Sequence, residues 1–130
     1  MGEFGARGNV GAVSAAVAEA LARRGLRFAD LDPWYYPEPD EYRMALENAG
    51  FGVESLVTFP RPTTLPGDVV GWLETFARAF LAPLPADERP PFCREVAAGL
   101  APALRREDGT WFVDYVRLRF DARKLPRARS

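Results

Sequence analysis

The stretch that decides the fold is EYRMALENAGFGVESLVTFP, residues 41–60. Its first half is rich in helix formers, Gly50 is the residue type that commonly follows a helix, and residues 51–59 are rich in β-formers. A further strand is expected over residues 110–120, TWFVDYVRLRF. A helix, a glycine stop and two strands together indicate an α/β protein.

The strand at 110–120 alternates between two kinds of side chain. Val116, Leu118 and Phe120 take one parity, and Arg117 and Arg119 take the other. Successive side chains of a strand point to opposite faces. One face of this strand is therefore expected to be buried and the other to be wet or partly covered.

Hydrophobic spacing predicts four helices. They cover residues 9–24, 40–49, 68–82 and 86–105. In the first helix, Asn9 is expected to be the N-cap and Gly25 to supply the stop. The third helix carries a broad aromatic face of Trp72, Phe76 and Phe80, which we expect to be buried. On that expectation, Phe76→Ala costs about 3–5 kcal/mol of stability.

The remaining segments are expected to be connectors. Residues 26–40 are predicted to be a loop, and PRPTTLPG at 60–67 a rigid link. Residues 107–109, Glu-Asp-Gly, are a turn signal. The basic tail at 121–130 is expected to be frayed.

Composition bounds the class of protein. The 130 residues are 48% hydrophobic and 27% charged, with a net charge of −1, which is the balance of a globular protein. This charge gives no field to attract nucleic acid or an anionic membrane. There is no secretory signal and no membrane-spanning stretch, so a cytoplasmic location is expected. The excess of arginine over lysine, with many alanines, suggests a bacterial source.

Two residue counts limit the chemistry. Cys93 is the only cysteine and there is no histidine. A Ser-His-Asp or Cys-His nucleophile system within this chain is therefore excluded, and so is an ordinary zinc site. No metal is expected, and Cys93 is expected to be a small buried hydrophobe.

Three overlapping or successive stretches carry a family resemblance. They are PWYYPEPDEYRMALENAGF (33–51), FGVESLVTFPRPTTLPGDVVGWLETFARAFLAPLP (51–85) and DGTWFVDYVRLRF (108–120). In this order they resemble the C-terminal part of class I S-adenosylmethionine-dependent methyltransferases, in particular the trans-aconitate methyltransferase-like enzymes. GEFG and GNV at the start resemble the end of strand five and the following helix. The later stretches resemble strands six and seven.

The resemblance implies a fold and an activity. It implies that residues 1–130 form one domain, a partial Rossmann-like α/β fold without the N-terminal cofactor-binding half. Strands 51–59 and 111–120 are then an antiparallel pair, with about four helices, two of them a lid-like insertion. A complete enzyme of this kind transfers a methyl group from S-adenosylmethionine to an oxygen or carboxylate of a small metabolite.

The chain departs from the family at the cofactor site. Neither the glycine-rich turn nor the acidic residue that binds the cofactor ribose is matched. Gly2, Gly5, Gly8 and Gly11 recur every three residues, whereas a dinucleotide fingerprint needs glycines at i, i+2 and i+5 after a full strand. A flexible strand-to-helix turn is the better interpretation than a phosphate cradle. We expect that this chain alone does not bind the cofactor. It is then either a truncated gene product or one piece of a split enzyme.

Candidate substrate residues come from the resemblance and from their chemistry. Aromatic side chains with polar tips suit a small organic substrate, and an arginine suits its carboxylate. The candidates are Glu3, Phe4, Asn9, Trp34, Tyr35, Tyr36, Arg61, Trp72 and Phe76. Each also has a purely structural interpretation, as a helix cap, a solvated charge or a packing residue.

Two alternatives remain open at this point. The arginines of the last strand and Lys124, Arg127 and Arg129 of the tail are better explained as a solvated surface than as an RNA-binding patch, because no aromatic residues interleave them. A non-catalytic interaction module is the second hypothesis for function. Its exposed sheet edge would recruit an N-terminal half of the enzyme or a second copy of the chain.

Overall fold

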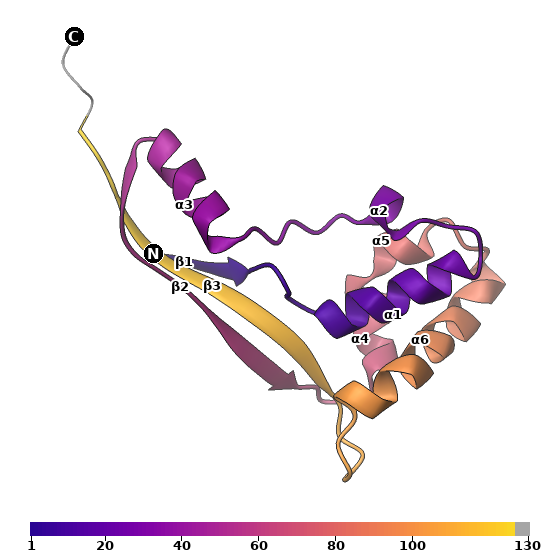
Figure 1. Cartoon of the computed structure of the whole chain (residues 1–130). Helices are drawn as coiled ribbons and strands as arrows, with labels where there is room; N and C mark the ends of the chain where they lie inside the picture. Colours follow the sequence, from indigo (N-terminus) through magenta and orange to yellow (C-terminus); the bar gives the residue numbers. More distant parts are fainter. Residues whose placement is uncertain (127–130) are drawn as a thin grey trace. The chain divides into compact units, whose positions relative to one another are not determined.

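The computed structural model describes residues 1–126. Within them the elements run in the following order: β1 (Gly2–Gly5), α1 (Gly11–Ala22), α2 (Phe28–Leu31), α3 (Pro39–Asn48), β2 (Phe51–Thr64), α4 (Val69–Phe76), α5 (Arg78–Leu81), a 3-10 turn η1 (Ala86–Glu88), α6 (Arg89–Leu104) and β3 (Phe112–Lys124) (Figure 1). The α/β prediction is confirmed. Arg127 and Arg129 lie outside the described residues.

The chain divides into two compact units. The first, called the sheet unit here, contains Met1–Asn9, Tyr35–Arg61 and the chain from Tyr115 onward. The second, called the helical unit, contains Val10–Trp34 and Pro62–Asp114. The chain passes between the units four times, so neither is a continuous stretch of sequence. That residues 1–130 form one domain stays a prediction.

The sheet unit is built around three strands in the order β1-β3-β2 (Figure 1). β1 runs antiparallel to β3, with Gly2 opposite Phe120 and Gly5 opposite Arg117. On the other side of β3, the amide of Leu125 donates to the carbonyl of Gly50, 2.8 Å away, just beyond the ends of β3 and β2. The predicted antiparallel pairing of the second and third strands is confirmed.

The predicted link at 60–67 is wrong, because β2 continues to Thr64. Proline lacks the amide donor and is tolerated in a strand only where no neighbour needs that donor. β2 is an edge strand of the described sheet, so Pro60 and Pro62 are compatible with it. β3 likewise runs on to Lys124, into the segment predicted to be a frayed tail.

The sheet has one apolar and one charged face. On the apolar face, Tyr42 of α3 packs edge-on against Phe4, with ring centroids 4.6 Å apart, and lies 5.3 Å from Phe120. Leu118, which is opposite Phe4, is fully buried. The other parity of the same strands carries Glu3, Arg117 and Arg119, as the alternation predicted.

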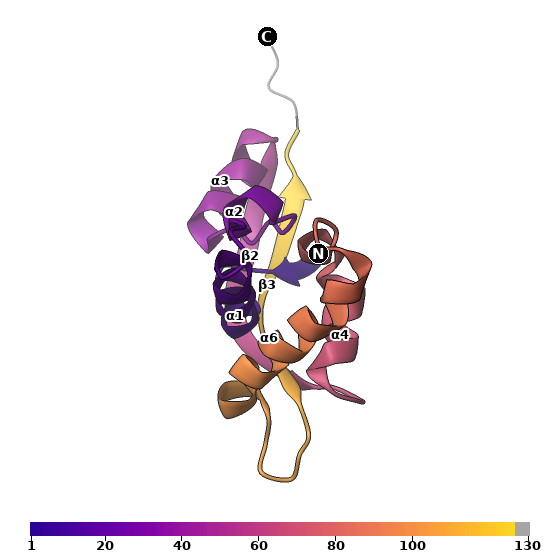
Figure 2. The same ribbon diagram turned by 90° about the vertical axis from the view of Figure 1, so that its right-hand side faces the viewer.

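The helical unit holds most of the fully buried side chains. α6 packs against α1 and against α4 (Figure 2). The apolar stripe of α1, formed by Val13, Val17 and Leu21, is buried, and Phe92, Val96 and Leu100 of α6 are buried as well. Cys93 is buried too, as predicted, and burial raises the pKa of its thiol.

The start of α1 differs from the prediction. Asn9 is not the N-cap; that position belongs to Val10, whose φ of 47° is left-handed and strained for a β-branched residue. The amide of Ala12 instead donates to Oδ2 of Asp114, 2.8 Å away, so a distant strand residue caps the helix. The stop at Gly25 is confirmed by its φ of 74°.

The predicted helix at 68–82 is two helices. α4 ends at Phe76, and α5 begins at Arg78 after Ala77 leaves helical geometry. Trp72 and Phe80 are buried as expected, but Phe76 is 56% exposed. The predicted burial of Phe76 is therefore wrong, and with it the 3–5 kcal/mol cost of removing its ring.

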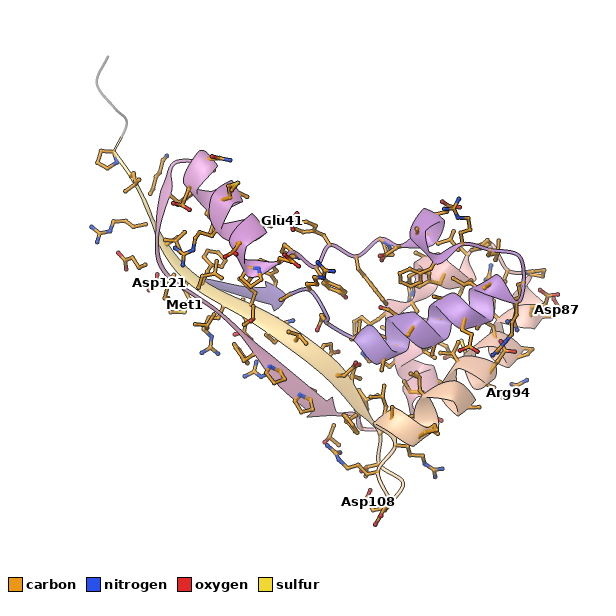
Figure 3. The ribbon with its side chains drawn as sticks, in the orientation of Figure 1. Met1, Glu41, Asp87, Arg94, Asp108 and Asp121 are labelled. Carbon is orange, nitrogen blue, oxygen red and sulfur yellow. The ribbon has the colours of Figure 1, made fainter. Side chains whose placement is uncertain are left out.

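The loop predicted at 26–40 contains a further short helix, α2, whose Phe28 stacks on Phe80 at a centroid distance of 4.8 Å. The turn at 107–109 is confirmed, and Asp108 lies at its tip (Figure 3). Within residues 1–126, no helix is long and apolar enough to cross a membrane.

Candidate functional site

Glu3 is the centre of an ion cluster on the charged face of the sheet. Nη1 of Arg61 lies 2.9 Å from one oxygen of its carboxylate. Nε of Arg117 lies 3.4 Å from that same oxygen, and Nη2 of Arg119 lies 3.3 Å from the other. Two of the sequence candidates, Glu3 and Arg61, are thus brought together. Arg117 and Arg119 complete what we call the Glu3 cluster.

The cluster carries an excess of positive charge. Three guanidinium groups surround one carboxylate, so the sum of these four side chains is +2. Partial burial by itself raises the pKa of Glu3, but hydrogen bonds from Arg119 and Arg117 and the nearby positive charges outweigh it and lower that pKa below its ordinary value. The lowered pKa makes Glu3 a weaker proton acceptor than an ordinary carboxylate, so the cluster suits charge pairing better than general-base catalysis.

Strand pairing and an aromatic ring position the arginines. Arg119 lies directly opposite Glu3 in the β1–β3 register. The guanidinium carbons of Arg119 and Arg61 lie 5.2 and 5.8 Å from the centre of the Phe59 ring. These are distances at which a guanidinium is attracted to an aromatic face. Phe59 on β2 therefore helps to hold both arginines beside Glu3.

Sequence reasoning missed the part played by Arg117 and Arg119. Their alternation with apolar residues was visible, but it equally fits a solvated strand face. The register of β3 on β1 and the position of β2 bring these two arginines into the cluster. Neither feature can be predicted from the local sequence.

Asn9 and Tyr36 lie at the end of β1. The side-chain oxygen of the buried Asn9 accepts a hydrogen bond from the amide of Val116 at 2.7 Å. A Cβ atom added at Gly5 would lie 2.7 Å from both the Asn9 amide nitrogen and the Tyr36 ring. Asn9 thus bridges the chain after β1 to β3, which is a structural role. Phe4 belongs to the apolar face, and Tyr35 is exposed.

The three remaining candidates form an aromatic row in the helical unit. Trp34 lies 6.4 Å from Trp72, and Trp72 lies 5.3 Å from Phe76, between ring centroids. Trp72 and Phe76 line an apolar groove of about 370 Å³, called the Trp72 groove below. Leu65, Pro66, Gly67, Asp68 and Gly71 form the rest of its lining.

A second hollow of the helical unit is larger and more polar. It measures about 500 Å³ and includes Glu74, Arg78, Arg89 and Cys93. Nε of Arg89 donates to the carbonyls of Leu81 and Leu84, each at 3.1 Å. Arg89 therefore satisfies the chain after α5, and its presence in the hollow is explained by the fold.

Two of the glycines at the start of the chain are closely packed. A Cβ atom at Gly2 would meet the Phe120 ring at 2.4 Å, and one at Gly5 would meet Asn9 and Tyr36. These two glycines allow close packing against side chains already in place. Within residues 1–126 there is also no group of three side chains that could hold a metal ion.

Comparison with known proteins gives one informative similarity. The chain is 40% identical over 126 residues to a protein of Schizosaccharomyces pombe that bears the name "uncharacterized methyltransferase". The match covers 94% of this chain and 48% of the relative, so the chain spans about half the length of the curated relative it matches. No protein-family model matches the chain.

Proposed function

We propose that the chain supplies the substrate side of an S-adenosylmethionine-dependent methyltransferase acting on an oxygen or carboxylate of a small metabolite. The observation that carries the proposal is the 40% identity, over 94% of the chain, to a protein named as a methyltransferase. The fold adds support, because the segments that resemble strands five, six and seven of class I methyltransferases pair into one sheet. The trans-aconitate-like group remains the proposed subfamily.

On this proposal the cofactor is held outside residues 1–130. Gly2 and Gly5 pack closely against side chains, and about half of the relative has no counterpart in this chain. The cofactor would bring the methyl group, and the residues described here would bind and orient its acceptor. The isolated 130-residue chain is then inactive.

The Glu3 cluster is the proposed anchor for an acceptor carboxylate. Arginine presents planar, paired donors that match the two oxygens of a carboxylate. The cluster already holds one carboxylate, that of Glu3, and its +2 excess favours a second.

A non-catalytic interaction module is the second candidate, and the two sheet edges favour it. The edge strand β2 carries Pro60, Arg61 and Pro62, which discourage pairing with another strand. β1 has no proline or lysine, and within residues 1–126 it pairs only with β3. Its outer edge can therefore accept a strand from an N-terminal half or from a second copy.

Co-expression tests both candidates. The chain is produced with the part of the S. pombe relative that lies outside the match, and S-adenosylhomocysteine release is measured with a panel of small carboxylic acids and alcohols. We expect turnover only when both pieces are present, and a higher KM for acids in Arg61→Gln. A stable complex without turnover would support the interaction module. Two pieces that neither associate nor react, together with a chain that stays monomeric in light scattering, would contradict both proposals.

A further inference from the structure

We propose that the Trp72 groove is a binding site for an uncharged planar ring. The groove measures about 370 Å³, which accommodates a one- or two-ring group. One wall is the paired rings of Trp72 and Phe76, and the facing residues Leu65 and Pro66 are apolar. Aromatic walls of this kind favour stacking or edge contacts with another ring.

The exposure of Phe76 is the first observation that indicates a ligand site in the groove. Its ring is 56% exposed, although it lies 5.3 Å from the buried Trp72. Within the described residues the Phe76 ring is not part of the buried core. Its apolar surface therefore remains exposed in the lining of the groove. An exposed aromatic beside a buried one is the arrangement that a bound ring would cover.

Gly71 is the second feature that keeps the groove open. It lies inside helix α4, where glycine is less favourable than alanine by roughly 1 kcal/mol. Neither usual reason for glycine holds here. A Cβ atom added at Gly71 meets nothing within 4 Å, and its φ is not positive. What the missing side chain does achieve is open space in the lining of the groove.

The groove is also pre-formed and selective by charge. The amide of Leu65 donates to the carbonyl of Trp111 at 2.8 Å, which fixes the loop that forms the facing wall. Asp68 is the one charged residue in the lining, and its carboxylate accepts from the amides of Val70 and Gly71 at the start of α4. A negative charge beside apolar walls disfavours an anionic ring, and the otherwise apolar lining suits the uncharged ring that we propose as the occupant.

The test uses indole and the whole chain labelled with nitrogen-15. Indole is titrated in the absence of S-adenosylmethionine, and the indole N–H resonance of Trp72, assigned with Trp72→Phe, reports binding. We expect a saturable shift with a millimolar Kd, and weaker binding of indole-3-carboxylate. No saturable shift, or equal shifts of the tryptophans Trp34, Trp72 and Trp111, would overturn the proposal.

Two matched variants separate a built groove from a surface hydrophobic contact. Gly71→Leu should raise Tm by about 2–5 °C, because leucine is the better helix former, and weaken indole binding at least about tenfold by filling the groove. Gly99→Leu, at another exposed helical glycine with open space around it, should raise Tm similarly and leave binding unchanged. Equal loss of binding in both variants, or in neither, would contradict the site.

That the ring belongs to the methyl acceptor rests on the proposed function, but ring binding itself does not. The two can fail separately. If indole binds but the co-expressed pair shows no methyl transfer, the ring site is supported and the proposed function is contradicted. Transfer that is indifferent to Gly71→Leu would keep the proposed function and show that the ring bound in the groove does not belong to the methyl acceptor.

Discussion

The helical unit holds most of the completely buried apolar side chains, whereas in the sheet unit most strand residues stay partly exposed. Phe80, Phe92 and Leu100 show almost no accessible surface. On the sheet, the face opposite the aromatic packing is instead occupied by the Glu3 cluster, whose side chains are 25–54% exposed. Burial of this kind stabilises a fold far more than partly exposed ion pairs do. The helical unit thus carries stability, and the charged sheet face is available for recognition.

The largest effect is expected in the helical core. Phe80→Ala should lower the free energy of unfolding by about 3–5 kcal/mol, because the Phe80 ring is fully buried between Phe28 and Trp34. Urea denaturation measures it, with Phe80→Leu as the milder control at under about 1.5 kcal/mol. A loss below 1 kcal/mol in the alanine variant, on the order of a surface change, would contradict the assignment of stability to this unit.

The next effect tests the hydrogen bond from the Val116 amide to Asn9. Asn9→Ala removes the acceptor of this partly buried amide, and a buried donor left without a partner costs about 1–3 kcal/mol, which is the upper range expected here. Asn9→Asp keeps an oxygen acceptor and should recover much of the loss in the same urea experiment. If alanine is tolerated without cost, the 2.7 Å contact does not contribute to the sheet unit.

The Glu3 cluster predicts a pH dependence. Since the pKa of Glu3 in the folded chain is lower than in the unfolded chain, its stabilising effect is complete above the unfolded pKa of about 4.3 and is lost as the pH falls through the folded pKa. Glu3→Gln should therefore make stability less sensitive to acid below about pH 5. Some sensitivity remains, because the pKa values of Glu95 and Asp108 are also lowered, by Arg24 and Thr110 respectively.

Thermal melts at several pH values between 3 and 7 measure this difference. Added salt should reduce it, since the cluster is partly exposed and its charges are screened. Identical acid profiles for the wild type and Glu3→Gln at low salt would show that the three arginines do not stabilise the ionised carboxylate.

The smallest effect is expected at Phe76. Phe76→Ala should change the free energy of unfolding by less than about 1 kcal/mol, because the ring is already 56% exposed. Trp72→Ala, one turn earlier on α4 and buried, is the contrasting variant and should cost about 3–5 kcal/mol. A large loss at Phe76 would restore the buried face expected from sequence.

Hydrophobic periodicity and the positions of glycines predict most of the helices and strands. The stripe on α1, the stops at Gly25 and Gly50 and the two-faced strand β3 all follow from local chemistry. The break at Ala77 could not be read in this way, since no proline or glycine marks it and residues 68–82 keep helical spacing. The prediction of the length of β2 was wrong for a related reason. Prolines at 60 and 62 are acceptable in this strand only because β2 lies at the edge of the sheet.

The candidate site was predictable only in part. The resemblance indicates Glu3 and side-chain chemistry indicates Arg61, and the sheet brings the two within 2.9 Å. Trp72 and Phe76 are aromatic candidates for contact with a substrate, and they line one groove. Asn9 was expected to cap α1, but Asp114, about a hundred residues away in sequence, does so. Contacts that depend on strand register or on segments distant in sequence cannot be predicted from local sequence patterns.

Calorimetric titration with S-adenosylmethionine tests the central claim most directly, namely that this chain is the substrate side of an enzyme whose cofactor site lies elsewhere. The titration is carried out on the isolated 130-residue chain and on its complex with the unmatched half of the S. pombe relative. We predict no measurable binding by the chain alone and 1:1 binding by the complex. A 1:1 micromolar isotherm with the chain alone, or none with the complex, would contradict the account.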